Sequence, residues 1–227
     1  VFHIELQPVY QMRGERGAQT AAGNVLPGAA APVGPGYLNW LSSHGLSGGP
    51  GLIVQVQDDG LDQGDASNAP GTAHPDLLGR IAGIFNATSD PLGDSASGHG
   101  QINAGIIVGN AAVGTTDADG YLLGQGLAPA AQVYGTKIFS NNGGFDIGSS
   151  SFTDLAKDAQ DAGALFSSNS WGASLFGAYS ADAAEFDALT RDADPTEPGN
   201  QPMIYFFSAG NDGPGGATLG SPGTAKN

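Results

Sequence analysis

Apolar runs alternate with helix-like patterns along the chain from residue 51 onward. Short apolar runs predict strands at 52–56, 132–139, 164–169 and 203–208. Mixtures of small, apolar and polar residues predict helices at 99–110, 152–162 and 180–193. Strands that alternate with helices indicate parallel βαβ units with right-handed crossovers. Strands this apolar are typical of a sheet that helices cover on both faces, which predicts an α/β fold.

The first fifty residues follow a different pattern. Residues 1–10 predict a short strand, and residues 14–50 are rich in Gly, Ala, Pro and Ser. One apolar anchor around Trp40 predicts a single short helix. We interpret residues 1–50 as a lead-in segment or a propeptide junction, and residues 51–227 as the main domain. Residues 61–97 predict a long irregular stretch, which inside a compact domain is typically functional or ion-bound.

Composition and charge exclude several classes of protein. The 227 residues carry 22 acidic and 7 basic side chains, for a formal net charge of -15. A chain this acidic is a poor ligand for nucleic acid, whose phosphates attract Lys and Arg. An apolar run of about 18 residues, long enough to cross a membrane, does not occur in the sequence. The sequence contains no cysteine, which excludes disulfide scaffolds, thiolate metal sites and a cysteine nucleophile.

Candidate chemistry gathers where the predicted strands end, because ligands of parallel sheets bind beyond the carboxyl ends of the strands. Asp58 ends the first apolar strand, and a carboxylate buried there needs a hydrogen-bond donor. His99 begins a predicted buried helix between two glycines and could be that donor, which would form the orienting half of a Ser-His-Asp triad. Asn211 follows the last strand and could donate to an oxyanion. The alternatives are turn or cap roles for these residues, and Asp59 is equally eligible by composition.

Seven stretches of the chain resemble motifs of the subtilisin-like serine proteases, or subtilases, in the order that the family has them. They are VQDDGLD at 56–62, HPDL at 74–77, GHG at 98–100 with AG at 104–105, GLAPAA at 126–131, NSWG at 169–172, SAGNDG at 208–213 and SPGTAKN at 221–227. The last stretch and NSWGA resemble a bacterial branch. The resemblance implies a three-layer subtilisin-like α/β fold with a mostly parallel central sheet flanked by helices, incomplete in this chain.

The resemblance also implies a role for each matching residue. Asp58 would orient His99, His99 would act as general base and then general acid, and Asn211 would donate to the oxyanion. Ser170, Trp171 and Gly172 would line the S1 pocket together with Ser208, Ala209 and Gly210. Asn142, Gly143, Gly144 and Phe145 would form the opposite edge, so that a substrate strand lies between two edges.

The sequence departs from the family pattern at three points. Gln101, Ile102 and Asn103 replace the usual Thr-His-Val after the catalytic His-Gly, and Asp59 replaces Ser or Thr. The family's nucleophile lies in a GTSMA motif beyond the SPGTAKN stretch, so residues 51–227 would be the amino-terminal two-thirds of a peptidase domain. We expect a second, C-terminal chain to carry the catalytic serine, and we expect residues 1–227 alone to be inactive. Ser47 formally fits GxSxG, but that elbow needs a helix after the serine, whereas a strand is predicted there.

These observations predict a secreted serine endopeptidase that hydrolyses extended polypeptides, without nucleic-acid or membrane partners. The alternative is a non-catalytic pseudoprotease that binds peptide without cutting it. Structural Ca²⁺ is expected from the family, with Asp117 and Asp119 in a D-x-D-G loop as candidate ligands. Further candidate pairs are Asp90 with Asp94 and Asp62 with Asp65. Ser149 to Ser151 are expected to cap the helix that follows them.

Overall fold

A single parallel sheet forms the centre of the molecule. The computed structural model describes residues 14–28 and 31–227, so the strand predicted at 1–10 lies outside the described residues. The five strands are β1 (Ile53–Asp58), β2 (Ile81–Asn86), β3 (Gln132–Lys137), β4 (Ala164–Asn169) and β5 (Ile204–Phe207). They pair in the order β2-β3-β1-β4-β5, and every pairing is parallel. The predicted α/β fold with a parallel sheet is therefore confirmed.

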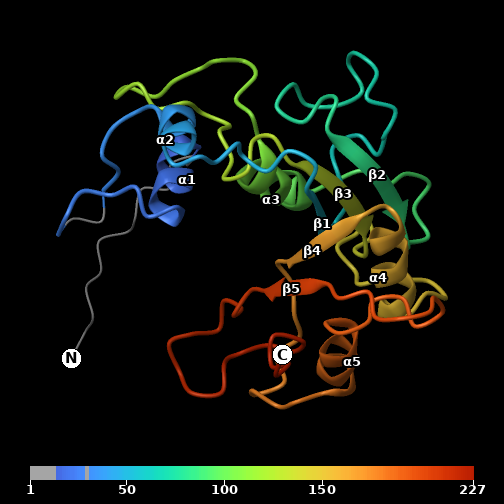
Figure 1. The fold of residues 1–227 in the computed structure, drawn as a ribbon. Helices are drawn as coiled ribbons and strands as arrows, with labels where there is room; N and C mark the ends of the chain where they lie inside the picture. The colour runs from blue at the N-terminus through green and yellow to red at the C-terminus, as the bar shows by residue number, and fades with distance from the viewer. Residues whose placement is uncertain (1–13, 29–30) are drawn as a thin grey trace.

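Helices cover both faces of this sheet (Figure 1). The helices are α1 (Glu15–Ala21), α2 (Tyr37–Ser43), α3 (His99–Val108), α4 (Phe152–Asp161) and α5 (Ala181–Leu189). One core cluster joins α3 to Val133 of β3, and a second joins α4 and α5 to Tyr134 of the same strand. Because consecutive residues of a strand point to opposite faces, α3 lies on one face and α4 and α5 lie on the other.

Within the described residues the predicted elements are present, and the structure adds two that were not predicted. The four predicted strands and three predicted helices are confirmed within a few residues, although α5 ends at Leu189 rather than near residue 193. The stretch 61–97 is not wholly irregular, because it contains β2. This strand lies at the edge of the sheet and pairs only with β3. Helix α1 was also not predicted, because its sequence ERGAQTA shows no apolar face.

The lead-in segment packs against the main domain through buried polar contacts. Glu15 of α1 is 1% exposed, and its carboxylate accepts hydrogen bonds from the backbone N–H groups of Tyr37 and Leu122, at 2.6 and 2.8 Å. The Tyr37 hydroxyl donates to the carbonyl of Leu127 at 2.8 Å. Figure 1 shows α1 and α2 together beyond α3, away from α4 and α5. The helix predicted around Trp40 is confirmed as α2.

Helix α4 begins at a capping box, as the serines before it predict. The Ser151 hydroxyl accepts from the backbone N–H of Asp154, and the Asp154 carboxylate accepts from the backbone N–H of Ser151. This reciprocal pair satisfies two backbone donors that the first turn of a helix leaves open. The cap fixes the start of α4 and with it the side chain of Phe152, which enters the core.

Phe186 of α5 lies at the centre of an aromatic cluster. It is 1% exposed, and its ring centroid lies 4.9 Å from that of Phe152 and 4.8 Å from that of Phe207. We expect Phe186→Ala to lower the free energy of unfolding by about 3–5 kcal/mol, because it removes a buried ring and leaves a cavity. Urea denaturation measures the change. Phe176→Ala is the matched control, since the Phe176 side chain is 85% exposed, and an equal loss in both variants would contradict the assignment.

Candidate active site

Asp58 and His99 meet at the carboxyl edge of the sheet. Asp58 is the last residue of β1 and is 3% exposed, whereas His99 is the first residue of α3 and its side chain is 57% exposed. The Nδ1 of His99 lies 2.7 Å from Oδ1 of Asp58. A buried carboxylate that accepts from Nδ1–H leaves Nε2 as the unprotonated nitrogen, which is the tautomer that a general base needs.

Asp59 holds the turn that leads into α3, and this role could not be read from the motif. Its carboxylate accepts from the Ser95 hydroxyl at 2.6 Å, from the backbone N–H of Ser97 at 3.0 Å and from that of Gly100 at 2.8 Å. Helix α3 has no cap from its own N-cap residue, Gly98. Asp59 therefore supplies the negative charge that favours a helix N-terminus and fixes where α3 begins relative to β1.

The hydrogen bonds of Asp59 make the stability of the fold depend on pH. Burial by itself raises the pKa of this carboxyl, but the bonds from Ser95, Ser97 and Gly100 outweigh burial and bring the pKa below its usual value. A carboxyl whose pKa is lower in the folded state stabilises the fold above its unfolded pKa of about 3.9. This stabilisation is lost as the pH falls through the lowered folded pKa.

We expect Asp59→Asn to lower the free energy of unfolding by about 1–2 kcal/mol at neutral pH, on the scale of a lost helix cap. The difference from wild type should be constant above about pH 5 and should shrink below about pH 4, where the wild-type carboxyl is also neutralised. Urea denaturation at several pH values measures it. A difference that is the same at pH 3 and pH 7 would contradict the role of the Asp59 charge. Glu197→Gln is the control, because Glu197 lies exposed in the loop after α5, outside this turn.

A cavity of about 390 Å³ opens beside the ends of β4 and β5. Its lining includes five of the six predicted pocket residues, Ser170, Trp171, Gly172, Ser208 and Gly210, together with the predicted oxyanion donor Asn211. The segment after β4 pairs with the C-terminal segment, because Ala173 and Ser221 exchange backbone hydrogen bonds of 2.8 and 2.9 Å. Ala209 is not among the lining residues, whereas Phe139, which was not predicted, is. The structure thus gathers the two predicted pocket segments around one cavity.

The predicted opposite edge follows β3 and approaches Trp171. Asn142 organises the turn, since its side-chain oxygen accepts from the backbone N–H of Gly144 at 2.9 Å. Residues Phe139 and Phe145 form an isolated bridge, and the Phe145 ring centroid lies 6.1 Å from that of Trp171. Gly143 has a φ of +84°, a left-handed conformation that favours glycine. Neither residues 142–145 nor His99 lines the 390 Å³ cavity itself.

Lysine and arginine side chains occupy the acidic pairs that were candidate metal ligands. The Arg16 guanidinium donates to Asp117 at 2.6 Å and also to Asp119, and the bond from Arg16 holds the pKa of Asp117 below its usual value. Lys137 is fully buried and lies 3.3 Å from Asp90 and 3.1 Å from Asp94.

Arg16 neutralises one of the two negative charges of Asp117 and Asp119 and takes up hydrogen-bonding capacity of both carboxylates. The remaining pair accepts backbone N–H bonds, Asp62 from His74 and Asp65 from Ser67. Residues 14–28 and 31–227 contain no group of three or more His, Cys, Asp or Glu side chains that could hold a metal ion. The expected structural Ca²⁺ stays a prediction from the family resemblance.

The comparison with known families agrees with this geometry. A sequence model of the Subtilase family matches residues 49–227, which is most of the chain. The chain belongs to the subtilase family. Membership accounts for the parallel sheet with helices on both faces, and it indicates serine peptidase chemistry. In this subtilase the seven motif stretches fall at strand ends, helix starts and the turns between them.

Sequence reasoning missed one residue that touches the Asp58–His99 pair. The Asn103 side chain donates from Nδ2 to Oδ2 of Asp58 at 3.0 Å. Asn103 was noticed only as a departure from the motif. A usable signal was present, because residues four apart in a helix lie on the same face, and Asn103 is four residues after His99.

Proposed function

We propose that this subtilase hydrolyses peptide bonds through a Ser-His-Asp triad in which Asp58 and His99 are two of the members. The observation that carries the proposal is the 2.7 Å contact between a buried carboxylate and the Nδ1 of a half-exposed imidazole. His99 Nε2 takes the proton of a serine hydroxyl as its oxygen attacks the substrate carbonyl. The same nitrogen then gives that proton to the leaving amine, and water repeats the cycle on the acyl-enzyme.

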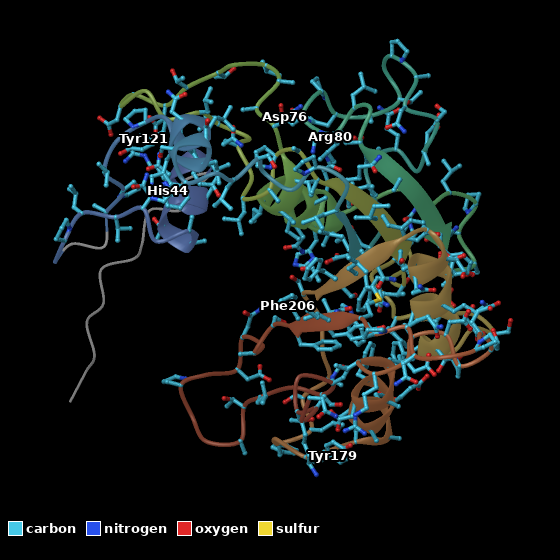
Figure 2. All side chains as sticks on the ribbon, viewed as in Figure 1. His44, Asp76, Arg80, Tyr121, Tyr179 and Phe206 are labelled. Carbon is cyan, nitrogen blue, oxygen red and sulfur yellow. The ribbon has the colours of Figure 1, made fainter. Side chains whose placement is uncertain are left out.

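The serine of this triad is proposed to come from outside residues 1–227. In the described part of the chain, the hydrogen bonds of the His99 ring involve only Nδ1, so Nε2 has no hydroxyl partner there. Side chains on the α3 face of the sheet support a covering segment. Tyr205 and Phe207 of β5 point toward α5, so Ile204 and Phe206 point to the α3 face, where they are 49% and 59% exposed. Figure 2 shows Phe206 projecting from β5.

Apolar side chains of α3 are exposed as well, with Ile102 at 63% and Ile106 at 56%. Large apolar side chains of a sheet face, such as Ile204 and Phe206, are rarely left in water, because a partner segment could bury them. Ile102 and Ile106 lie on the outer side of α3, opposite its buried residues Gly100 and Ala104. We propose that a C-terminal, serine-bearing chain covers this face and completes a two-chain enzyme. In that arrangement the new serine would reach Nε2 of His99, the ring nitrogen opposite Asp58.

Substrate binding is proposed along the two segments that meet near Trp171. An extended polypeptide would lie between residues 142–145 and residues 170–172 and pair with both as an added strand. The cavity of about 390 Å³ would take the side chain before the scissile bond, and Phe139 and Trp171 in its lining favour bulky apolar or aromatic side chains. Asn211, exposed at the same cavity, would donate its side-chain amide to the oxyanion.

The proposed setting of this activity is outside the cell, where subtilases often act. Helices that are long and apolar enough to cross a membrane are absent from the described residues. The alternative function is peptide binding without cleavage, which keeps the cavity and both edges but needs no serine. The departures from the family motif at residues 101–103, within α3, and at Asp59 favour a test of that alternative.

A fluorophosphonate probe distinguishes the two functions. The probe is added to the native protein purified from its source, and the labelled serine is located by peptide mass spectrometry. We expect one labelled serine, on a polypeptide or segment outside residues 1–227. Labelling that is absent at every pH while peptide still binds would establish the binding function instead. Intact-mass measurement tests the two-chain form, which a folded, monomeric and single 22.6 kDa species would contradict.

A further inference from the structure

The two oxygens of Asp58 have different partners. Oδ1 accepts from His99 Nδ1 at 2.7 Å and from the backbone N–H of Asp59 at 2.8 Å. Oδ2 accepts from the side-chain amide of Asn103 at 3.0 Å, and among the described residues Asn103 is its one donor. Because Asp58 is 3% exposed, water cannot readily replace that donor. Burying a carboxylate oxygen without a hydrogen-bond donor destabilises the fold, so the bond from Asn103 stabilises the buried Asp58 carboxylate.

A single helix supplies both side chains that bind this carboxylate. His99 and Asn103 are one turn apart on α3, so they project from the same face toward the end of β1. Asn103 Nδ2 also lies 3.3 Å from His99 Nδ1. Two N–H donors do not bond to each other, and both instead point at the same carboxylate. The reverse orientation of the amide would place its oxygen against Oδ2 of Asp58, where two acceptors repel.

We propose that Asn103 is a positioning residue for the Asp58–His99 pair. Its amide fixes the rotation of the Asp58 carboxylate, which keeps Oδ1 in line with Nδ1–H and keeps His99 in the tautomer with a free Nε2. The inference rests on the proposed function, because this orientation matters only if His99 acts as a base. The position is valine in the family motif, so the amide donor is a feature of this chain rather than of the motif.

Two substitutions of nearly the same shape test the proposal in the native, complete enzyme. Asn103→Leu removes the donor, and we expect kcat to fall about tenfold with KM unchanged, on the scale of one hydrogen bond to a charged group. Asn103→Asp replaces the donor with a carboxylate that faces Asp58, and we expect a larger fall at neutral pH. The other charged groups here are Asp59 and His99, and Asp59 is already bonded to Ser95, Ser97 and Gly100.

The pH dependence separates positioning from packing. A protonated carboxyl can donate to Asp58 again, so the ratio of the Asn103→Asp rate to the wild-type rate should rise as the pH is lowered. A purely structural defect would leave that ratio constant. Asn39→Leu and Asn39→Asp are the matched controls, because Asn39 lies exposed on α2 and takes no part in the site. Both control variants should keep the wild-type kcat and KM.

Each result then has one meaning. An active wild type with unchanged kcat in Asn103→Leu, or with a constant ratio in Asn103→Asp, overturns the positioning role and leaves the triad intact. A wild type that neither hydrolyses peptide nor takes the fluorophosphonate label overturns the proposed function and this inference with it. If neither variant folds, NMR of the wild-type protein tests the proposal. We expect a nuclear Overhauser effect between the Nδ1 proton of His99 and the Asn103 side-chain amide, and its absence overturns the proposal.

Discussion

Replacing His99 with alanine is expected to lower kcat for peptide hydrolysis by about a millionfold, the scale on which a triad histidine contributes. The imidazole is the only group of the described residues that contacts the buried Asp58 carboxylate and also presents a ring nitrogen to solvent. Without it, a serine hydroxyl loses the base that takes its proton. KM should change little, because the predicted substrate edges at 142–145 and 170–172 are untouched. Steady-state kinetics on a peptide substrate measures both constants.

His44→Ala is the control for this variant. His44 is the C-cap residue that follows α2. Its Nδ1 lies 2.8 Å from the Trp40 carbonyl, and Figure 2 shows it on the α1–α2 pair, away from β5. We expect His44→Ala to retain wild-type kcat and KM. An activity of His99→Ala within a factor of ten of wild type would mean that another group is the base, and the triad assignment would then be wrong.

The sequence could predict the Asp58–His99 pair because both residues lie where the topology of the sheet brings elements together. Asp58 ends an apolar strand, and His99 begins a helix that crosses the same face. A parallel sheet directs both toward its carboxyl edge. The family motifs then pointed to Trp171 and Asn211 at the same edge of the sheet, and in the structure both residues line one cavity. At these positions the order of strands and helices along the chain was nearly enough to predict which residues meet.

The contacts of Asp59 and Lys137 could not be predicted in the same way. Each depends on a loop approaching from a distant part of the chain, as when residues 95–97 fold over Asp59. Strand β2 was missed for a similar reason, since its pairing with β3 defines it more than its own six residues do. The acidic pairs suggested calcium because carboxylates at close spacing suit that ion, but the spacing could not show that Arg16 and Lys137 would reach them.

Adding a methyl group at Gly100 is expected to separate α3 from β1 and to lower kcat/KM at least a hundredfold. A Cβ at this position would collide with the carbonyl oxygen of Gly60, and it would lie 2.9 Å from Oδ1 of Asp59 and 3.0 Å from Cβ of Asp58. Backbone cannot move aside as a flexible side chain can, so the helix start must shift. A shift of about 1 Å at His99 costs about a hundredfold in rate, because the base no longer lines up with its partners.

Gly105→Ala separates this steric effect from the general effect of alanine in a helix. Gly105 lies in the same helix, and a Cβ there would meet no atom within 4 Å outside the local helix backbone. Alanine is the better helix former by about 0.5–1 kcal/mol, so Gly105→Ala should keep wild-type kcat/KM and raise the urea midpoint of unfolding. Gly100→Ala should lower both. Equal kinetics in the two variants would show that α3 can start farther from β1 without loss. The close approach of Gly100 to the turn after Asp58 would then not be what aligns the pair.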